Sequence, residues 1–128
     1  MTGLPLSDLR ILIVEDDYYL ATDARISIEK AGGTVVGPFA TTEEARAALK
    51  AGGVDLAILD INLGSGPRFD LARHLHAAGL PFLFATGYDQ AVVPEDLKSV
   101  ARLEKPFRAV ALIDAAASLH QAASGSRP

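Results

Sequence analysis

Apolar runs that match buried strands alternate along the chain with stretches that carry apolar residues at helical spacing. The run "LRILIV" at residues 9–14 is apolar at nearly every position, which is typical of a strand covered on both faces of a sheet. The pattern predicts strands at residues 9–14, 34–37, 54–60, 80–85 and 100–104. It predicts helices over residues 16–31, from residue 42, over 67–78, in a short segment near 94–100, and over 107–122. This alternation indicates an α/β protein with a doubly wound parallel sheet.

Local signals mark where several of the predicted helices start and stop. Thr41-Thr42-Glu43-Glu44 has the spacing of a capping box and starts the second helix. Lys-Ala-Gly-Gly follows two helices, at residues 30–33 and 50–53, and glycine past a helix end supplies the left-handed cap. Pro67 suits the first turn of the third helix.

Charged and polar residues follow the predicted strands at their carboxyl ends, which share one edge of a parallel sheet. Clustered carboxylates repel one another and resist ionisation unless a cation lies among them. Oxygen ligands of this kind suit Mg²⁺, and a lysine beside a carboxylate suits phosphoryl transfer. The residues concerned are Glu15, Asp16 and Asp17 after the first strand, Asp60 and Asn62 after the third, Thr86 after the fourth, and Lys105 after the fifth.

Each of these residues taken alone also fits an ordinary structural role. Any of the three acids at residues 15–17 could cap the first helix, because helix starts favour negative charge. Asp60 could cap a turn, and a lysine such as Lys105 is usually solvated. The joint occurrence at matching strand ends is what favours a functional site.

Composition narrows the class of protein further. The chain has 128 residues, no cysteine and a formal net charge of −4. These values favour one domain in a reducing compartment, and they disfavour nucleic-acid binding by a charged surface. No apolar stretch has transmembrane length and the start lacks the shape of a signal peptide, so we expect a cytoplasmic protein with no membrane partner. We expect an N-terminal segment at 1–7, a domain at 8–122 and a flexible tail at 123–128.

Four segments, "ILIVEDD", "LAILDIN", "FATG" and "EKPF", resemble the receiver domain of bacterial two-component response regulators. The resemblance covers residues 8–122 and keeps the family's order. It implies a flavodoxin-like (βα)5 sheet with strand order 2-1-3-4-5 and a single-domain response regulator. It also implies a phosphoacceptor that assists its own phosphorylation and dephosphorylation rather than an enzyme.

The same resemblance implies a role for each matching residue. Asp60 accepts the phosphoryl group. Mg²⁺ is held by Asp16 directly, by Glu15 through water, by Asp60, and by the backbone carbonyl of Asn62. Thr86 is the switch hydroxyl, Lys105 pairs with the phosphoryl group, and the bond before Pro106 is cis.

The sequence departs from ordinary receivers at the switch. Those proteins carry an aromatic residue three positions before the lysine, and this chain has Arg102 there. "PFLFATGY" is similar to the motif of the FAT GUY receivers, a subgroup that lacks this aromatic and resembles partners of HWE-type histidine kinases. Tyr88 is then either the replacement switch aromatic or a packing residue at the sheet edge.

Two functions from different classes remain at this point. One is a phosphorylated signalling protein that receives its phosphoryl group from a sensor histidine kinase or a phosphotransfer protein. It would then bind an unknown downstream protein or act as a phosphate relay or sink. The alternative is a pseudo-receiver, a binding module that works without phosphorylation. A phosphatase of the haloacid dehalogenase type is disfavoured because Asn62 stands where its second aspartate is expected.

Overall fold

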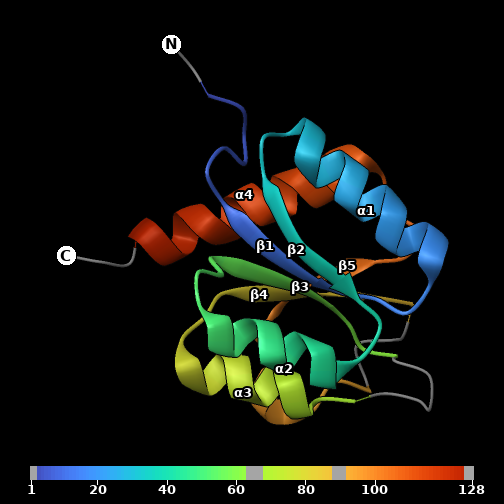
Figure 1. The fold of residues 1–128 in the computed structure, drawn as a ribbon. Coiled ribbons are helices and arrows are strands. Elements are labelled where there is room, and N and C mark those ends of the chain that lie inside the picture. The colour runs from blue at the N-terminus through green and yellow to red at the C-terminus, as the bar shows by residue number, and fades with distance from the viewer. Residues whose placement is uncertain (1–2, 63–67, 88–91, 126–128) are drawn as a thin grey trace.

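The computed structural model describes residues 3–62, 68–87 and 92–125, and it contains one parallel sheet with helices on both sides (Figure 1). The strand order is β2-β1-β3-β4-β5, and every neighbouring pair is parallel. The sequence-based prediction of a flavodoxin-like, doubly wound sheet is therefore confirmed. The strands are β1 (Arg10–Val14), β2 (Thr34–Phe39), β3 (Leu56–Asp60), β4 (Phe82–Thr86) and β5 (Ala101–Glu104). The helices are α1 (Tyr18–Lys30), α2 (Thr42–Ala51), α3 (Asp70–Ala78), the 3₁₀ turn η2 (Glu95–Leu97) and α4 (Ala109–Gly125).

The core consists of two apolar layers, one on each face of the sheet. Figure 1 shows α1 and α4 on one side of the sheet and α2 and α3 on the other. Successive side chains of a strand point to opposite faces, so the apolar run of β1 supplies both layers. Leu12 and Val14 pack in the layer under α2 and α3, whereas Ile11 and Ile13 pack under α1 and α4. This double burial explains why the inner strands are apolar at nearly every position.

Side-chain caps set the starts of α1 and α2. The carboxylate of Asp17 accepts hydrogen bonds from the backbone N–H groups of Tyr19 and Leu20, at 2.9 and 3.0 Å. The first helix therefore begins at Tyr18, two residues later than the periodicity indicates. At α2, the Thr41 hydroxyl oxygen accepts from the Glu44 N–H at 3.2 Å, as the predicted capping box requires.

The segment between β4 and β5 differs from the periodic pattern. Only 18 residues separate Thr86 from Lys105, and part of that span must form a strand. In the described part, residues 92–100, helical structure is limited to the 3₁₀ turn η2 and residue 92, so the predicted short helix near 94–100 is reduced to about one turn. Val93 and Leu97 are nevertheless buried in the core layer under α2 and α3.

Other element bounds differ by a few residues. β2 continues through Pro38 to Phe39, which an edge strand tolerates because one side needs no ladder hydrogen bonds. Gly37 has φ 106°, and a Cβ there would lie 2.8 Å from the Phe39 nitrogen, so this position requires glycine. Helix α3 is described from Asp70, and the predicted role of Pro67 falls outside the described residues. Helix α4 continues to Gly125.

Candidate functional site

Strand pairing brings four of the predicted site residues to one edge of the sheet. Val14 pairs with Leu59, which places Glu15 beside Asp60 at the ends of β1 and β3. Asp60 pairs with Ala85, the residue before Thr86. Thr86 pairs with Glu104, the residue before Lys105. Because all these strands are parallel, their carboxyl ends form a single rim.

Lys105 is the cation at the centre of this rim. Its Nζ lies 2.7 Å from Glu15 Oε1 and 3.4 Å from Asp60 Oδ2. The lysine side chain is 18% exposed, and those of the two acids are 8% and 4% exposed. Buried charges of this kind are tolerated only when they are paired, so these three groups form one electrostatic unit.

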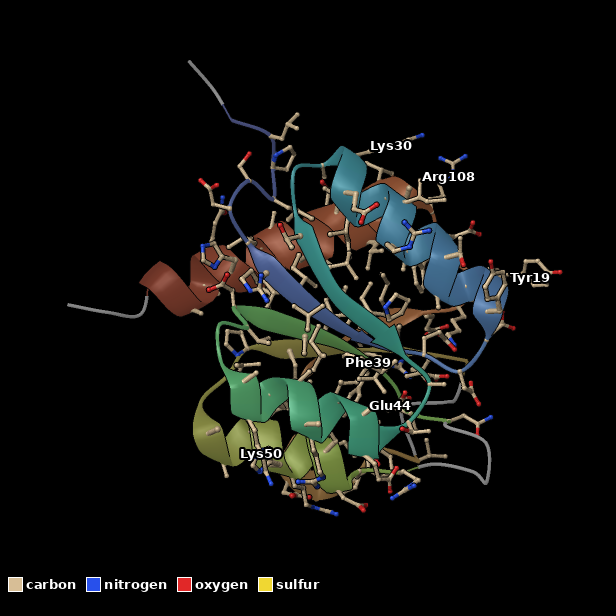
Figure 2. The ribbon with its side chains drawn as sticks, in the orientation of Figure 1. Tyr19, Lys30, Phe39, Glu44, Lys50 and Arg108 are labelled. Carbon is tan, nitrogen blue, oxygen red and sulfur yellow. The ribbon has the colours of Figure 1, made fainter. Side chains whose placement is uncertain are left out.

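Backbone N–H groups orient both buried acids. Asn62 N–H donates to Asp60 Oδ1 at 3.1 Å, and Asp17 N–H donates to Glu15 Oε2 at 3.2 Å. The backbone of Glu15 is itself fixed, because its N–H donates to the carbonyl of Phe39 at 2.9 Å. Figure 2 shows Phe39 at the end of β2 and Tyr19 projecting from the first turn of α1 away from the sheet.

The electrostatics of the unit shift two pKa values. Burial, followed by the hydrogen bond and the negative charge of Glu15, raises the pKa of Asp60 from its usual 3.8 to about 7, although Lys105 and the Asn62 N–H act in the opposite direction. Burial alone would lower the pKa of Lys105, but its hydrogen bond to Glu15 and the charges of Asp60 and Glu15 raise it. Lys105 therefore stays charged at neutral pH, whereas ionisation of Asp60 is held back by its surroundings.

The acidic residues at this rim could hold a metal ion. Glu15, Asp16 and Asp60 each offer a carboxylate oxygen, and these oxygens lie within 4.8 Å of one another. Two of the acids are buried and Asp16 is exposed, so a bound cation would be protein-coordinated on one side and open to water on the other. Such a set of hard oxygen donors fits Mg²⁺, which usually retains several water ligands.

A cavity of about 340 Å³ opens over these carboxylates. Its walls include Asn62, Leu20 and Gly87, and a Cβ added to Gly87 would meet nothing within 4 Å. Leu20 is not among the site residues predicted from the sequence, where it is one apolar position of the helix expected over residues 16–31. Its position in the first turn of α1, three residues after Asp17, is the signal that could have indicated it. The lining residues are Glu15, Asp16, Asp17, Leu20, Asp60, Asn62, Gly87 and Lys105.

The remaining predicted residues lie next to this unit or outside the described residues. The Thr86 side chain is fully buried, and its carbonyl accepts from the Lys105 N–H at 2.8 Å. Arg102 lies on β5 in register with Phe84, and its Nη2 is 3.3 Å from Glu104 Oε1. The Lys105–Pro106 bond is cis. Tyr88 lies outside the described residues, so its predicted role stays a prediction.

Comparisons with known proteins agree with this arrangement. Residues 11–117 match the family described as the response regulator receiver domain. The solution structure of SdrG from Sphingomonas melonis Fr1 is similar, with 36% sequence identity and a TM-score of 0.76, over 93% of this chain and 98% of that chain. A solution structure titled as the BeF3-activated conformation of SdrG, from Pseudomonas melonis Fr1, has 36% identity and a TM-score of 0.74, over 93% of this chain and 99% of that one.

A crystal structure of a response regulator receiver protein from Sinorhizobium medicae WSM419 is also similar. It shares 26% identity over 90% of this chain and 96% of that chain, with a TM-score of 0.76. Comparison with curated protein sequences gives no match. Within the described residues, no helix is long and apolar enough to cross a membrane. The chain belongs to the response regulator receiver domain family.

Proposed function

We propose that Asp60 accepts a phosphoryl group from a phospho-histidine of a sensor histidine kinase or a phosphotransfer protein. In this step an Asp60 carboxylate oxygen forms a bond to phosphorus while the bond from phosphorus to the histidine nitrogen breaks. The product is an acyl phosphate on Asp60, and the imidazole leaves and takes up a proton. The observation that carries the proposal is the pairing of buried Asp60 with Lys105 beneath an open cavity lined with carboxylates.

The surrounding residues suit this transfer. Phosphoryl transfer depends mostly on positioning and on neutralisation of charge. Lys105 Nζ is near Asp60 Oδ2, where it can also contact an oxygen of the incoming phosphoryl group. The Asn62 N–H fixes the other Asp60 oxygen. Mg²⁺ would be held by Asp16, Asp60 and the Asn62 carbonyl, with Glu15 acting through water, and it would supply positive charge for the transferring oxygens.

The proposed response to phosphorylation begins at Thr86. Its hydroxyl belongs to the strand next to β3, so it can donate a hydrogen bond to a phosphoryl group on Asp60 with little backbone movement. Tyr88 and Arg102 are proposed to take part in the change that follows, with Tyr88 in place of the usual aromatic. The similar protein SdrG has a BeF3-activated conformation. BeF3 is a tetrahedral analogue of a phosphoryl group, which supports the same kind of switch here.

Partners of the proposed response regulator follow from this chemistry. The donor is a histidine kinase, of HWE type if the FAT GUY resemblance holds, or a phosphotransfer protein. The phosphorylated domain binds a downstream protein in the cytoplasm or passes the phosphoryl group on. We propose that the protein assists its own phosphorylation and dephosphorylation and does not act as an enzyme on an external substrate.

Phosphorylation with a small donor tests the proposal. The protein is incubated with acetyl phosphate and Mg²⁺, and its intact mass is measured. We expect a mass increase of one phosphoryl group in the wild type and none in Asp60→Asn. The matched control is Asp55→Asn. It changes the aspartate that directly precedes β3, at the end of the strand away from Asp60, and this variant should be labelled as the wild type is. A wild type that stays unlabelled, or a fully labelled Asp60→Asn variant, would contradict the proposal, and the first result would favour the pseudo-receiver alternative.

A further inference from the structure

An ion pair with two contacts joins α3 to the turn η2. Arg73 Nε lies 3.0 Å from Asp96 Oδ2, and Arg73 Nη2 lies 3.2 Å from Asp96 Oδ1. The two residues are 23 positions apart, and their side chains are about half exposed. The hydrogen bond with Asp96 raises the pKa of Arg73, and the same bond lowers the pKa of Asp96. A parallel fork of this kind is more specific in geometry than a single contact, because both nitrogens must face both oxygens.

The two segments that this pair joins both leave the candidate site. The chain from Asp60 leads into α3, and the carbonyl of Ile61 accepts from the Arg68 N–H at 2.9 Å on the way. The chain from Thr86 leads to η2 and then to β5. The Arg73–Asp96 pair therefore closes a ring that contains the phosphoacceptor position on one branch and the switch hydroxyl on the other.

Apolar residues in and next to η2 pack against the core, whereas Asp96 lies on the exposed side of the turn and forms the ion pair. Val93 and Leu97 are 3% and 0% exposed and belong to the same core layer as Leu71 and Leu75 of α3. Apolar contacts of this kind are non-directional, so they hold the turn against α3 without fixing its position along the helix. The fork between Arg73 and Asp96 supplies that directional restraint.

We propose that the Arg73–Asp96 pair is a latch that favours the position of η2 in the unphosphorylated protein. This inference rests on the proposed function and concerns its regulation. A contact shifts a two-state equilibrium only if it is stronger in one state than in the other. When Thr86 forms a hydrogen bond with a phosphoryl group on Asp60, the chain that leads from Thr86 to η2 shifts, while α3 stays packed on the sheet. The two hydrogen bonds between Arg73 and Asp96 are then lost first, because they require the guanidinium and the carboxylate to stay aligned.

The size of the expected effect follows from the exposure of the pair. Measured contributions of exposed ion pairs are small, so removing this one changes the population ratio about two- to fivefold at most. If small phosphodonors react with the phosphorylation-competent conformation, their rate scales with the population of that conformation. Loss of the latch should therefore accelerate phosphorylation, whereas loss of a purely structural contact should leave the rate unchanged or lower it.

A double-mutant cycle tests the latch in the full chain. Arg73→Gln, Asp96→Asn and the double variant are phosphorylated with acetyl phosphate and Mg²⁺, and rates are followed by intact mass. Each single variant should react about two- to fivefold faster than the wild type, and the double variant no faster than the singles. Amide exchange over residues 93–100 of the unphosphorylated protein should accelerate in the same variants. The control Glu29→Gln breaks the exposed Arg25–Glu29 pair of 3.1 Å within α1 and should change neither measurement.

The outcomes separate the latch from the proposed function. A wild type that cannot be phosphorylated overturns the proposed function, and the latch with it. A wild type that is phosphorylated, with all three variants at the wild-type rate, overturns the latch alone. Additive accelerations in the double variant also overturn it, because they show that the two side chains act separately.

Discussion

Replacing Asp60 by asparagine should stabilise the metal-free protein at pH 8. Asparagine is nearly isosteric with aspartate and can keep the hydrogen bond from the Asn62 N–H, but it carries no charge. In the wild type, burial and the neighbouring Glu15 carboxylate raise the pKa of Asp60 from 3.8 to about 7. At pH 8 the folded protein must therefore hold an ionised carboxylate in a place that disfavours it, and the substitution removes this cost.

The magnitude follows from the linkage between protonation and folding. A rise of the pKa from 3.8 to about 7, at 1.36 kcal/mol per pKa unit, corresponds to about 4 kcal/mol. The folded state binds more protons than the unfolded state between these pH values, so this contribution makes the wild type less stable as the pH rises from about 4 to about 7, and then levels off. Lys105 loses one of its two partners in the variant, and this loss reduces the expected gain at pH 8 to about 2–4 kcal/mol.

Urea unfolding of both proteins in chelator, at several values between pH 5 and pH 8, measures this difference. The gain should be somewhat more than a third of its final value at pH 5, should grow as the pH rises, and should reach its plateau above pH 7. Adding Mg²⁺ should reduce or reverse it, because a cation that binds the ionised site stabilises the folded wild type. A variant that is less stable than the wild type at pH 8, or a difference that does not change with pH, would refute the reasoning. Asp23→Asn, at an aspartate of α1 outside the Lys105 ion pairs, is the control.

Two further substitutions test other parts of the site. Lys105→Met leaves Glu15 and Asp60 without their cation and should lower the free energy of unfolding at pH 8 by about 3 kcal/mol, with a smaller loss at pH 5 where Asp60 is protonated; equal losses at both pH values in urea unfolding would speak against the electrostatic origin. Asp16→Ala removes the exposed carboxylate of the acidic cluster and should abolish both Mg²⁺-dependent thermal stabilisation and phosphorylation by acetyl phosphate. Phosphorylation of the wild type in excess chelator would reject the metal role.

The sheet could be predicted from the sequence because burial on both faces leaves a distinctive pattern. Runs such as residues 11–14 are apolar at every position, and this pattern is typical of parallel strands that are covered by helices on both faces. The rim followed from the same logic, since polar residues after successive parallel strands must come together. Strand lengths were predicted less well, because β2 continues through Pro38 at a sheet edge.

Details that depend on competition between side chains could not be read from the sequence. Three acids follow β1, and nothing in their order shows that Asp17 caps α1 while Glu15 turns inward to Lys105. The pairing of Arg102 with Glu104 depends on the geometry of the β5 edge. The sequence did indicate that the fourth helix must be short, but it did not show that the described residues 92–100 contain only about one 3₁₀ turn, because Val93 and Leu97 are four positions apart and fit a regular helix equally well.

The ion pairs of Lys105 also have a consequence for how the edge of the sheet is held together. β5 is a four-residue edge strand, and none of its residues is fully buried, so apolar packing alone holds it weakly. Glu15 directly follows the inner strand β1, Asp60 ends the inner strand β3, and both acids are buried in the folded domain. Without β5 these two acids would lack the ammonium group of Lys105, and docking of β5 brings that group within 2.7 Å of Glu15 and 3.4 Å of Asp60. The ion pairs of Lys105 thus help to hold the edge strand β5 against the central strands of the sheet.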